Sequence, residues 1–179
     1  MMRRVRTRRW VWRLAYVLIA LIVTLAMMLP LGAQAGDWPG PDLLLCITLA
    51  WTVRRPNMMV APLIAAVLLA EDVLLMRPPG LWTAIVLLGS EVLRSRVALA
   101  RELNFLTEWL AVSALMVGME LAYRFVFAMV FLPQVALGYA MLKVTASILC
   151  YPVVVLVSTW MLGLHKPATG EIDAYGRRM

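Results

Sequence analysis

Three apolar segments, separated by short polar breaks, fill the chain between residues 41 and 96. The breaks are rich in arginine, proline and glycine, and they read RRPN at 54–57, MRPPG at 76–80 and RSR at 94–96. None of them is long enough to form a soluble domain. Apolar segments joined so tightly are typical of helices that cross a membrane repeatedly, because a helix satisfies its own backbone hydrogen bonds inside the bilayer.

The rest of the chain has the same character. Of its 179 residues, 63% are hydrophobic and 15% are charged, whereas a soluble domain is about half apolar and a quarter charged. We therefore predict an all-α, polytopic membrane protein, a single six-helix transmembrane bundle followed by a polar cytoplasmic tail at 165–179. The expected helices cover 14–31, 42–54, 57–76, 81–96, 103–132 and 134–164.

The placement of Lys and Arg decides how the segment 43–53 is interpreted. At about 1.5 Å per residue its rise is only ~16 Å, against a hydrocarbon core of ~30 Å, so it either crosses as a short helix or is re-entrant. Six crossings place fourteen cationic side chains on one side and only Arg77 on the other. That asymmetry is the positive-inside pattern. We expect both termini in the cytoplasm.

The basic residues at the start of the chain lie directly before an apolar run. We interpret them as partners of anionic lipid in the cytoplasmic leaflet rather than of nucleic acid. The start also resembles a signal peptide with Ala33-Gln34-Ala35 as the cleavage site, but its apolar run is longer than that of a usual signal peptide. We therefore expect an uncleaved first helix.

The sequence contains no arrangement typical of catalysis, of a cofactor site or of a metal site. Its one histidine, His165, lies in the tail, so no Ser/His/Asp or Cys/His group is expected inside the membrane. No P-loop, GxGxxG or HExxH motif occurs. We expect a protein that is not an enzyme, with no cofactor and no bound metal.

Several charged side chains fall within apolar segments: Glu71, Asp72, Glu91, Glu120, Arg124 and Lys143. Such residues are costly in a bilayer and usually face protein or water, so they indicate either a proton or substrate path or ion pairs that fix the helices. We favour ion pairs. Depths counted from a tight turn at Pro133 predict that Glu91, Glu120, Arg124 and Lys143 form one buried structural cluster joining the fourth, fifth and sixth helices.

The fifth expected helix also carries small residues at intervals of four, Ala114, Gly118 and Ala122. This spacing lets another helix approach closely. It predicts a helix contact, either within the chain or with a partner, which includes a possible homodimer.

Motifs in the stretch 41–80 occur in a characteristic order. Proline and an acid open the second segment, an aromatic residue lies late in it, a basic-proline turn follows, and an acid late in the third segment precedes a glycine-containing turn. These residues are Pro41, Asp42, Trp51, Arg54, Arg55, Pro56, Asp72 and Gly80. Together with the six apolar segments and the basic start, they resemble the bacterial rod shape-determining proteins of the MreD family.

The resemblance implies a multi-pass, non-catalytic protein of the bacterial cytoplasmic (inner) membrane that supports cell shape, cell elongation and peptidoglycan synthesis as part of the elongasome. The partners it implies are MreC, the MreB filament, and the RodA glycosyltransferase with its class B penicillin-binding transpeptidase. The family is similar in fold to the S-components of vitamin transporters, so the alternative is a small-molecule-binding subunit of a transporter. The Ala-xxx-Ala pattern typical of the first helix of S-components is missing among Ala15, Ala20 and Ala26.

Overall fold

The computed structural model describes residues 2–29, 39–56, 58–95 and 104–162, and the regular structure in these ranges is entirely α-helical. This confirms the predicted all-α class. The helices are α1 (Met2–Met28), α2 (Leu43–Arg54), α3 (Ala61–Leu74), α4 (Leu81–Ser95), α6 (Phe105–Met129) and α7 (Leu137–Leu162).

Three of these helices are long and apolar enough to cross a membrane. They are α1 over Trp10–Met28, α6 over its whole length and α7 over Leu137–Trp160. The other three, α2, α3 and α4, have 12, 14 and 15 residues and rise only ~18–23 Å, less than the ~30 Å of a hydrocarbon core. The membrane character of the chain is therefore supported by three helices, and the six-crossing topology stays a prediction.

The short helix α2 occupies the middle of the bundle. Ten of its twelve residues are buried, and it packs against α7, α4 and α1. Trp51 lies against Trp12 and Tyr16 of α1, with ring centroids 6.2 and 5.8 Å apart. The Tyr16 hydroxyl and the Thr48 Oγ1 hydroxyl are hydrogen-bonded at 2.8 Å. A helix with side chains buried all round is typical of a bundle centre.

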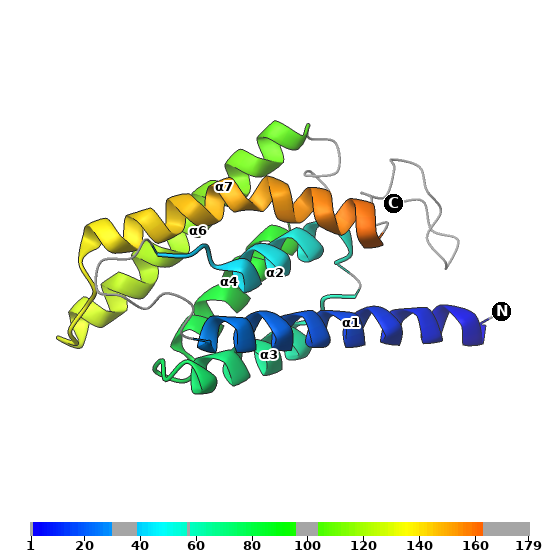
Figure 1. Ribbon diagram of the computed structural model, residues 1–179, viewed down its shortest axis with the longest axis horizontal. Helices are drawn as coiled ribbons and strands as arrows, with labels where there is room; N and C mark the ends of the chain where they lie inside the picture. The colour runs from blue at the N-terminus through cyan, green and yellow to red at the C-terminus, as the bar shows by residue number, and fades with distance from the viewer. Residues whose placement is uncertain (1, 30–38, 57, 96–103, 163–179) are drawn as a thin grey trace.

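Successive helices run in opposite directions along the molecule (Figure 1). The beginning of α1 and the ends of α2, α4 and α7 lie at one end, whereas the turns after α3 and α6 lie at the other. We call the first the arginine end, because Arg13, Arg54, Arg55 and Arg94 lie there, and the second the opposite end. Among the described residues, those predicted to lie on the cytoplasmic side are therefore at the arginine end, and those predicted to lie on the outer side are at the opposite end.

Most helix boundaries lie within about four residues of the predicted ones, and the differences at the start of α1 and between α6 and α7 have a physical reason. The helix α1 begins at Met2 rather than at residue 14, because nothing in the arginine-rich start breaks a helix. The helix α6 ends at Met129 rather than at residue 132, and α7 begins at Leu137 rather than at residue 134. Pro133 disfavours helical geometry at the residue before it, and Phe131 has a positive φ of 55°. The turn between α6 and α7 is therefore longer than predicted.

Candidate functional site

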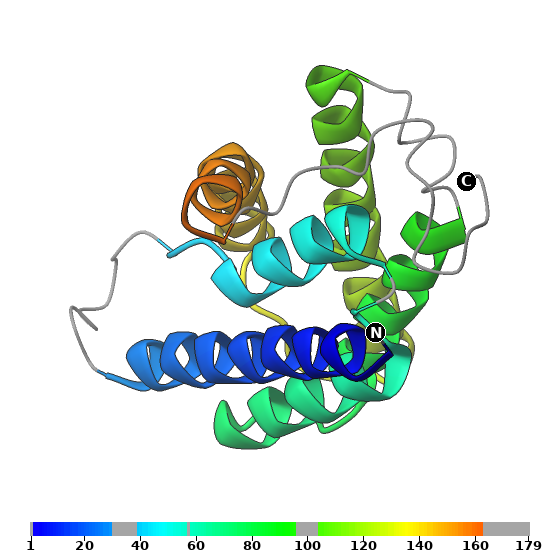
Figure 2. The same ribbon diagram turned by 90° about the vertical axis from the view of Figure 1, so that its right-hand side faces the viewer.

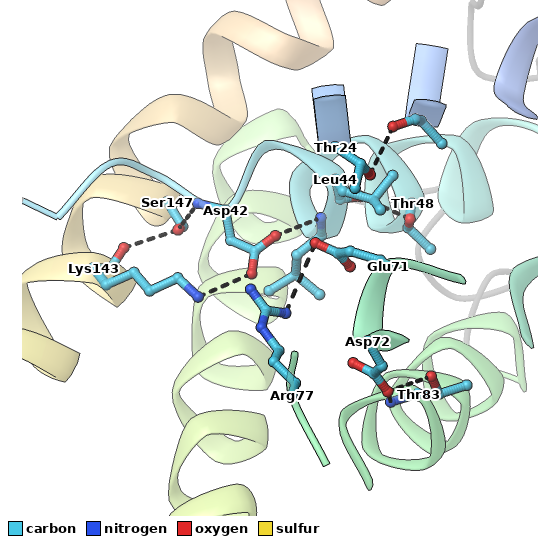
Figure 3. Close-up of polar contacts among 12 residues, drawn as sticks. Thr24, Asp42, Leu44, Thr48, Glu71, Asp72, Arg77, Thr83, Lys143 and Ser147 are labelled. Carbon is cyan, nitrogen blue, oxygen red and sulfur yellow. Dashed lines mark hydrogen bonds and ion pairs between the residues drawn. The ribbon is translucent and has the colours of Figure 1, made fainter. Parts of the chain in front are cut away.

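A polar cluster links α2 to α7 at the opposite end of the bundle (Figure 3). Asp42 is the N-cap of α2, and its Oδ1 accepts a hydrogen bond from the Leu45 N–H at 3.0 Å. Its Oδ2 accepts a bond from Lys143 Nζ at 3.2 Å, and its own N–H donates to Ser147 Oγ at 2.8 Å. The N-cap role fits the sequence, because the carboxylate precedes the first free N–H groups of the helix. The link to α7 was not foreseen.

The next part of the cluster is the loose ion pair of Glu71 and Arg77. The side chain of Glu71 is 1% exposed, and Arg77 Nη1 lies 3.8 Å from its Oε1. This separation is too long for a hydrogen bond. No described group donates a hydrogen bond to either carboxylate oxygen of Glu71. Figure 3 shows the guanidinium of Arg77 between the carboxylates of Asp42 and Glu71. Arg77 thus lies close to two buried acids, one of which also binds Lys143.

Asp72, the neighbour of Glu71, shapes the turn between α3 and α4. Its Oδ2 accepts hydrogen bonds from the Gly80 N–H at 3.1 Å, the Thr83 N–H at 3.3 Å and the Thr83 Oγ1 hydroxyl at 2.8 Å. Gly80 has a φ of +91°, a conformation that glycine adopts without the strain of a Cβ atom. Asp72 therefore binds free N–H groups at the start of α4, where a negative charge is favourable.

A small cavity lies beside the Asp42–Lys143 pair. Its lining includes Asp42, Trp82, Glu120, Lys143 and Ser147. Lys143 Nζ also lies 5.9 Å from the centroid of the Trp82 ring, within the range of a cation–π interaction. The cavity has a volume of about 10 Å³, which is about enough to hold one water molecule. Its lining combines polar or charged groups with apolar side chains, and it has no room for a ligand of vitamin size.

The structure brings together only part of the predicted cluster of Glu91, Glu120, Arg124 and Lys143. Glu120 lies within electrostatic range of Lys143 and Arg124, whereas Glu91 lies elsewhere. Lys143 binds Asp42 instead, and of the other three only Glu120 lines the same cavity. Glu91 binds Arg94 at 2.7 Å at the arginine end. The guanidinium of Arg124 donates to the Val135 carbonyl at 3.1 Å. The depths were counted from Pro133, but α7 begins four residues later, so Lys143 lies only ~9 Å along it and reaches the start of α2.

A buried ion pair at the arginine end was missed from the sequence. Arg54 Nη1 donates to Glu108 Oε1 at 2.9 Å, and their side chains are 5% and 1% exposed. The Tyr151 hydroxyl donates to the same carboxylate oxygen at 2.9 Å. These contacts join α2, α6 and α7. Its position in the first turn of α6 would by itself suggest that Glu108 reaches the membrane interface. The sequence carries no local signal of its partners.

Other residues of the 41–80 motifs also lie at joints of the fold. The indole N–H of Trp51 donates to Ser158 Oγ of α7 at 3.3 Å. The N–H of Arg55 closes the end of α2 on the Trp51 carbonyl at 2.7 Å. Pro41 precedes the N-cap, and Pro56 follows the C-cap, a position where proline is expected because it disfavours helix at the residue before it. These motif residues therefore hold helices in place.

The stripe of small residues faces outward. Ala114, Gly118 and Ala122 are exposed on α6, and a Cβ atom built at Gly118 would meet nothing within 4 Å. The stripe therefore makes no helix contact within the described chain. Two contacts were predicted for the stripe, one within the chain and one with a partner protein. Only the contact with a partner remains as a prediction.

No set of three or more His, Cys, Asp or Glu side chains among the described residues is arranged as metal ligands. Comparisons with protein families, with characterised proteins and with solved structures gave no match for this chain.

Proposed function

We propose that this protein is a non-catalytic scaffold of the bacterial inner membrane that supports cell elongation and peptidoglycan synthesis, as the MreD resemblance implies. Its partners would be MreC, RodA with its transpeptidase, and the MreB filament. The observation that carries the proposal is the position of the motif residues. Asp42 and Asp72 bind the starts of α2 and α4, Arg54 binds Glu108, and Trp51 binds Ser158. These motif residues hold the helices in fixed positions, which suits a protein that acts by offering helix surfaces to its partners.

The helix faces themselves support this proposal. Large apolar side chains are exposed along α1, α6 and α7, and they include Ile22, Phe125 and Trp160 at 65%, 63% and 85% exposure. Such faces suit lipid or the helices of other membrane proteins. The exposed small-residue stripe of α6 is the part of this surface best suited to a close helix contact.

The proposed topology has six crossings, with the arginine end and both termini in the cytoplasm. It requires the short helices α2, α3 and α4 to cross as well. The position of α2 makes this possible for that helix, because it is packed against α7, α4 and α1 and is buried on most of its surface. A short hydrophobic length is tolerated when flanking side chains reach the interface and the bilayer thins locally.

The alternative function, a small-molecule-binding subunit of a transporter, is not favoured by the cavity beside Asp42 and Lys143. Vitamin-sized ligands need pockets of several hundred Å³, whereas this one has room for about one water molecule.

Depletion in a rod-shaped host tests the proposed function. The cells should become round, and MreC should lose its association with RodA in affinity purifications from native membranes. Restoring the wild-type protein should reverse both effects. Cells that keep their shape, with a protein that co-purifies with a pair of ATPase subunits, would favour the transporter alternative and contradict the scaffold role.

A further inference from the structure

Arginines from two other helices meet at the turn that follows α2. The Nε–H of Arg13 in α1 donates to the Met58 carbonyl at 3.3 Å, and Nη2 of Arg94 in α4 donates to the Met59 carbonyl. The turn begins at Arg55, whose own carbonyl accepts hydrogen bonds from the N–H groups of Met58 and Met59. The guanidinium groups of Arg13 and Arg94 and the backbone of Arg55 therefore lie in one small region of the arginine end. Figure 2 views this end of the molecule from the front.

Positive charge is in excess in this region. Arg54 is paired with the buried Glu108, and Arg94 with the half-exposed Glu91. Within the described ranges, no carboxylate lies within 4.0 Å of Arg13 or Arg55. Two cations are thus left to be balanced by something other than the described chain.

The same arginines also have hydrogen-bond donors to spare. The Nε–H groups of Arg55 and Arg94 are shielded from solvent and have no acceptor among the described atoms. The terminal guanidinium nitrogens of Arg13 and Arg55 form no hydrogen bond with any described group, and they are not shielded from solvent. A shielded donor without an acceptor is costly and often marks a missing water or ion.

The neighbouring aromatic residues indicate the depth of this region in a membrane. Trp10 is 56% exposed, and the Arg13 guanidinium lies 5.7 Å from its ring centroid. Exposed tryptophan is enriched where lipid headgroups meet the hydrocarbon. The apolar part of α1 begins immediately after Arg13. The three arginines therefore lie at the level of the lipid phosphates.

We propose that Arg13, Arg55 and Arg94 form a binding site for the phosphate of an anionic phospholipid from the cytoplasmic leaflet. A guanidinium offers a planar pair of donors that matches phosphate oxygens, and the excess positive charge selects a lipid with net negative charge. Bound there, the headgroup neutralises the two unmatched cations and holds α1, α4 and the α2–α3 turn together. The site requires a bilayer around the helices, but it does not depend on the scaffold role.

The test uses the full-length protein, stripped of lipid in detergent and titrated with phosphatidylglycerol while bound lipid is counted by native mass spectrometry. Arg13→Gln and Arg55→Gln should each weaken phosphatidylglycerol binding about tenfold, the effect of losing one hydrogen bond to a charged group. Arg124→Gln is the matched control, since it removes one cation near the opposite end and should leave binding unchanged. Phosphatidylcholine and inorganic phosphate serve as comparison ligands.

Three results would overturn the proposal. One is equal binding of phosphatidylcholine and phosphatidylglycerol, because the excess charge would then select nothing. Another is binding of inorganic phosphate as tight as that of phosphatidylglycerol, which would assign the site to a soluble anion. The third is a loss of phosphatidylglycerol binding in Arg124→Gln as large as that in Arg13→Gln or Arg55→Gln. Binding would then depend on the net charge of the protein and not on a particular site. If Arg55→Gln does not fold, Arg55→Lys keeps the charge and should still bind phosphatidylglycerol more weakly than the wild type, because an ammonium cannot form the paired contact.

Discussion

The buried pair of Arg54 and Glu108 offers the sharpest test of the packing at the arginine end. Replacing Glu108 by Leu leaves the guanidinium of Arg54 buried without its carboxylate, and it also removes an acceptor from the Tyr151 hydroxyl. Loss of one partner of a buried ion pair typically costs ~3–5 kcal/mol. We therefore expect Glu108→Leu to lower the free energy of unfolding by about 3–5 kcal/mol, and Arg54→Leu to act similarly.

The double variant Arg54→Leu with Glu108→Leu should be milder than either single change. Among the contacts of the described residues it leaves no buried charge unpaired, so the cost expected there comes mainly from the Tyr151 hydroxyl, about 1–3 kcal/mol for a buried polar group without a partner. The pair of Glu91 and Arg94 is the matched control. Its side chains are 49% and 26% exposed, and an exposed pair contributes only ~0–1 kcal/mol. Glu91→Leu should therefore have little effect.

The assay is unfolding of the purified protein in mixed micelles with increasing denaturing detergent, followed by helical circular dichroism. The four proteins of the cycle are the wild type, the two single variants and the double variant. Coupling is present when the double variant loses less stability than the two single variants together. Additive losses, or a loss from Glu91→Leu as large as that from Glu108→Leu, would refute the buried pair.

Three further substitutions test other joints and surfaces. Asp72→Ala should lower the free energy of unfolding by about 1–3 kcal/mol in the same assay, because the start of α4 near Thr83 loses its acceptor; an unchanged value would contradict that role. Gly89→Val should cost about 1–3 kcal/mol, because a Cβ atom there would lie 1.8 Å from the Met119 terminal methyl, and Met119→Ala should relieve part of the loss; no relief would place the strain elsewhere. Gly118→Leu should leave membrane abundance unchanged, since the position is open, but should weaken co-purification of a partner; unchanged co-purification would exclude the stripe as the contact.

The order of the helices could be predicted because every break carries residues that a membrane helix excludes. The RRPN and MRPPG breaks end α2 and α3 within a few residues of the expected positions. The N-cap role of Asp42 was also readable, since a carboxylate directly before an apolar run is a standard helix start. These features depend only on neighbours in the sequence.

The lateral contacts could not be predicted, because they depend on which faces of distant helices meet. Lys143 and Asp42 are 101 residues apart, and Arg54 and Glu108 are 54 apart. A helix that is apolar all round gives no polar stripe from which to infer its inward face. Depth alone therefore grouped Lys143 with Arg124 and Glu91, whereas the later start of α7 lets Lys143 reach Asp42, and Glu91 binds Arg94.

The six-crossing topology is most directly tested at the two ends of α4, the 15-residue helix between the exposed residues Pro79 and Ser95. The native cysteines, Cys46 and Cys150, are first replaced by alanine. Single cysteines at Pro79 or Ser95 are then exposed to an impermeant thiol reagent in cells stripped of their outer barrier. The cysteine at Pro79 should label in intact cells, and that at Ser95 only after the inner membrane is opened. Labelling of both positions in intact cells would show that α4 does not cross, and it would contradict a cytoplasmic arginine end.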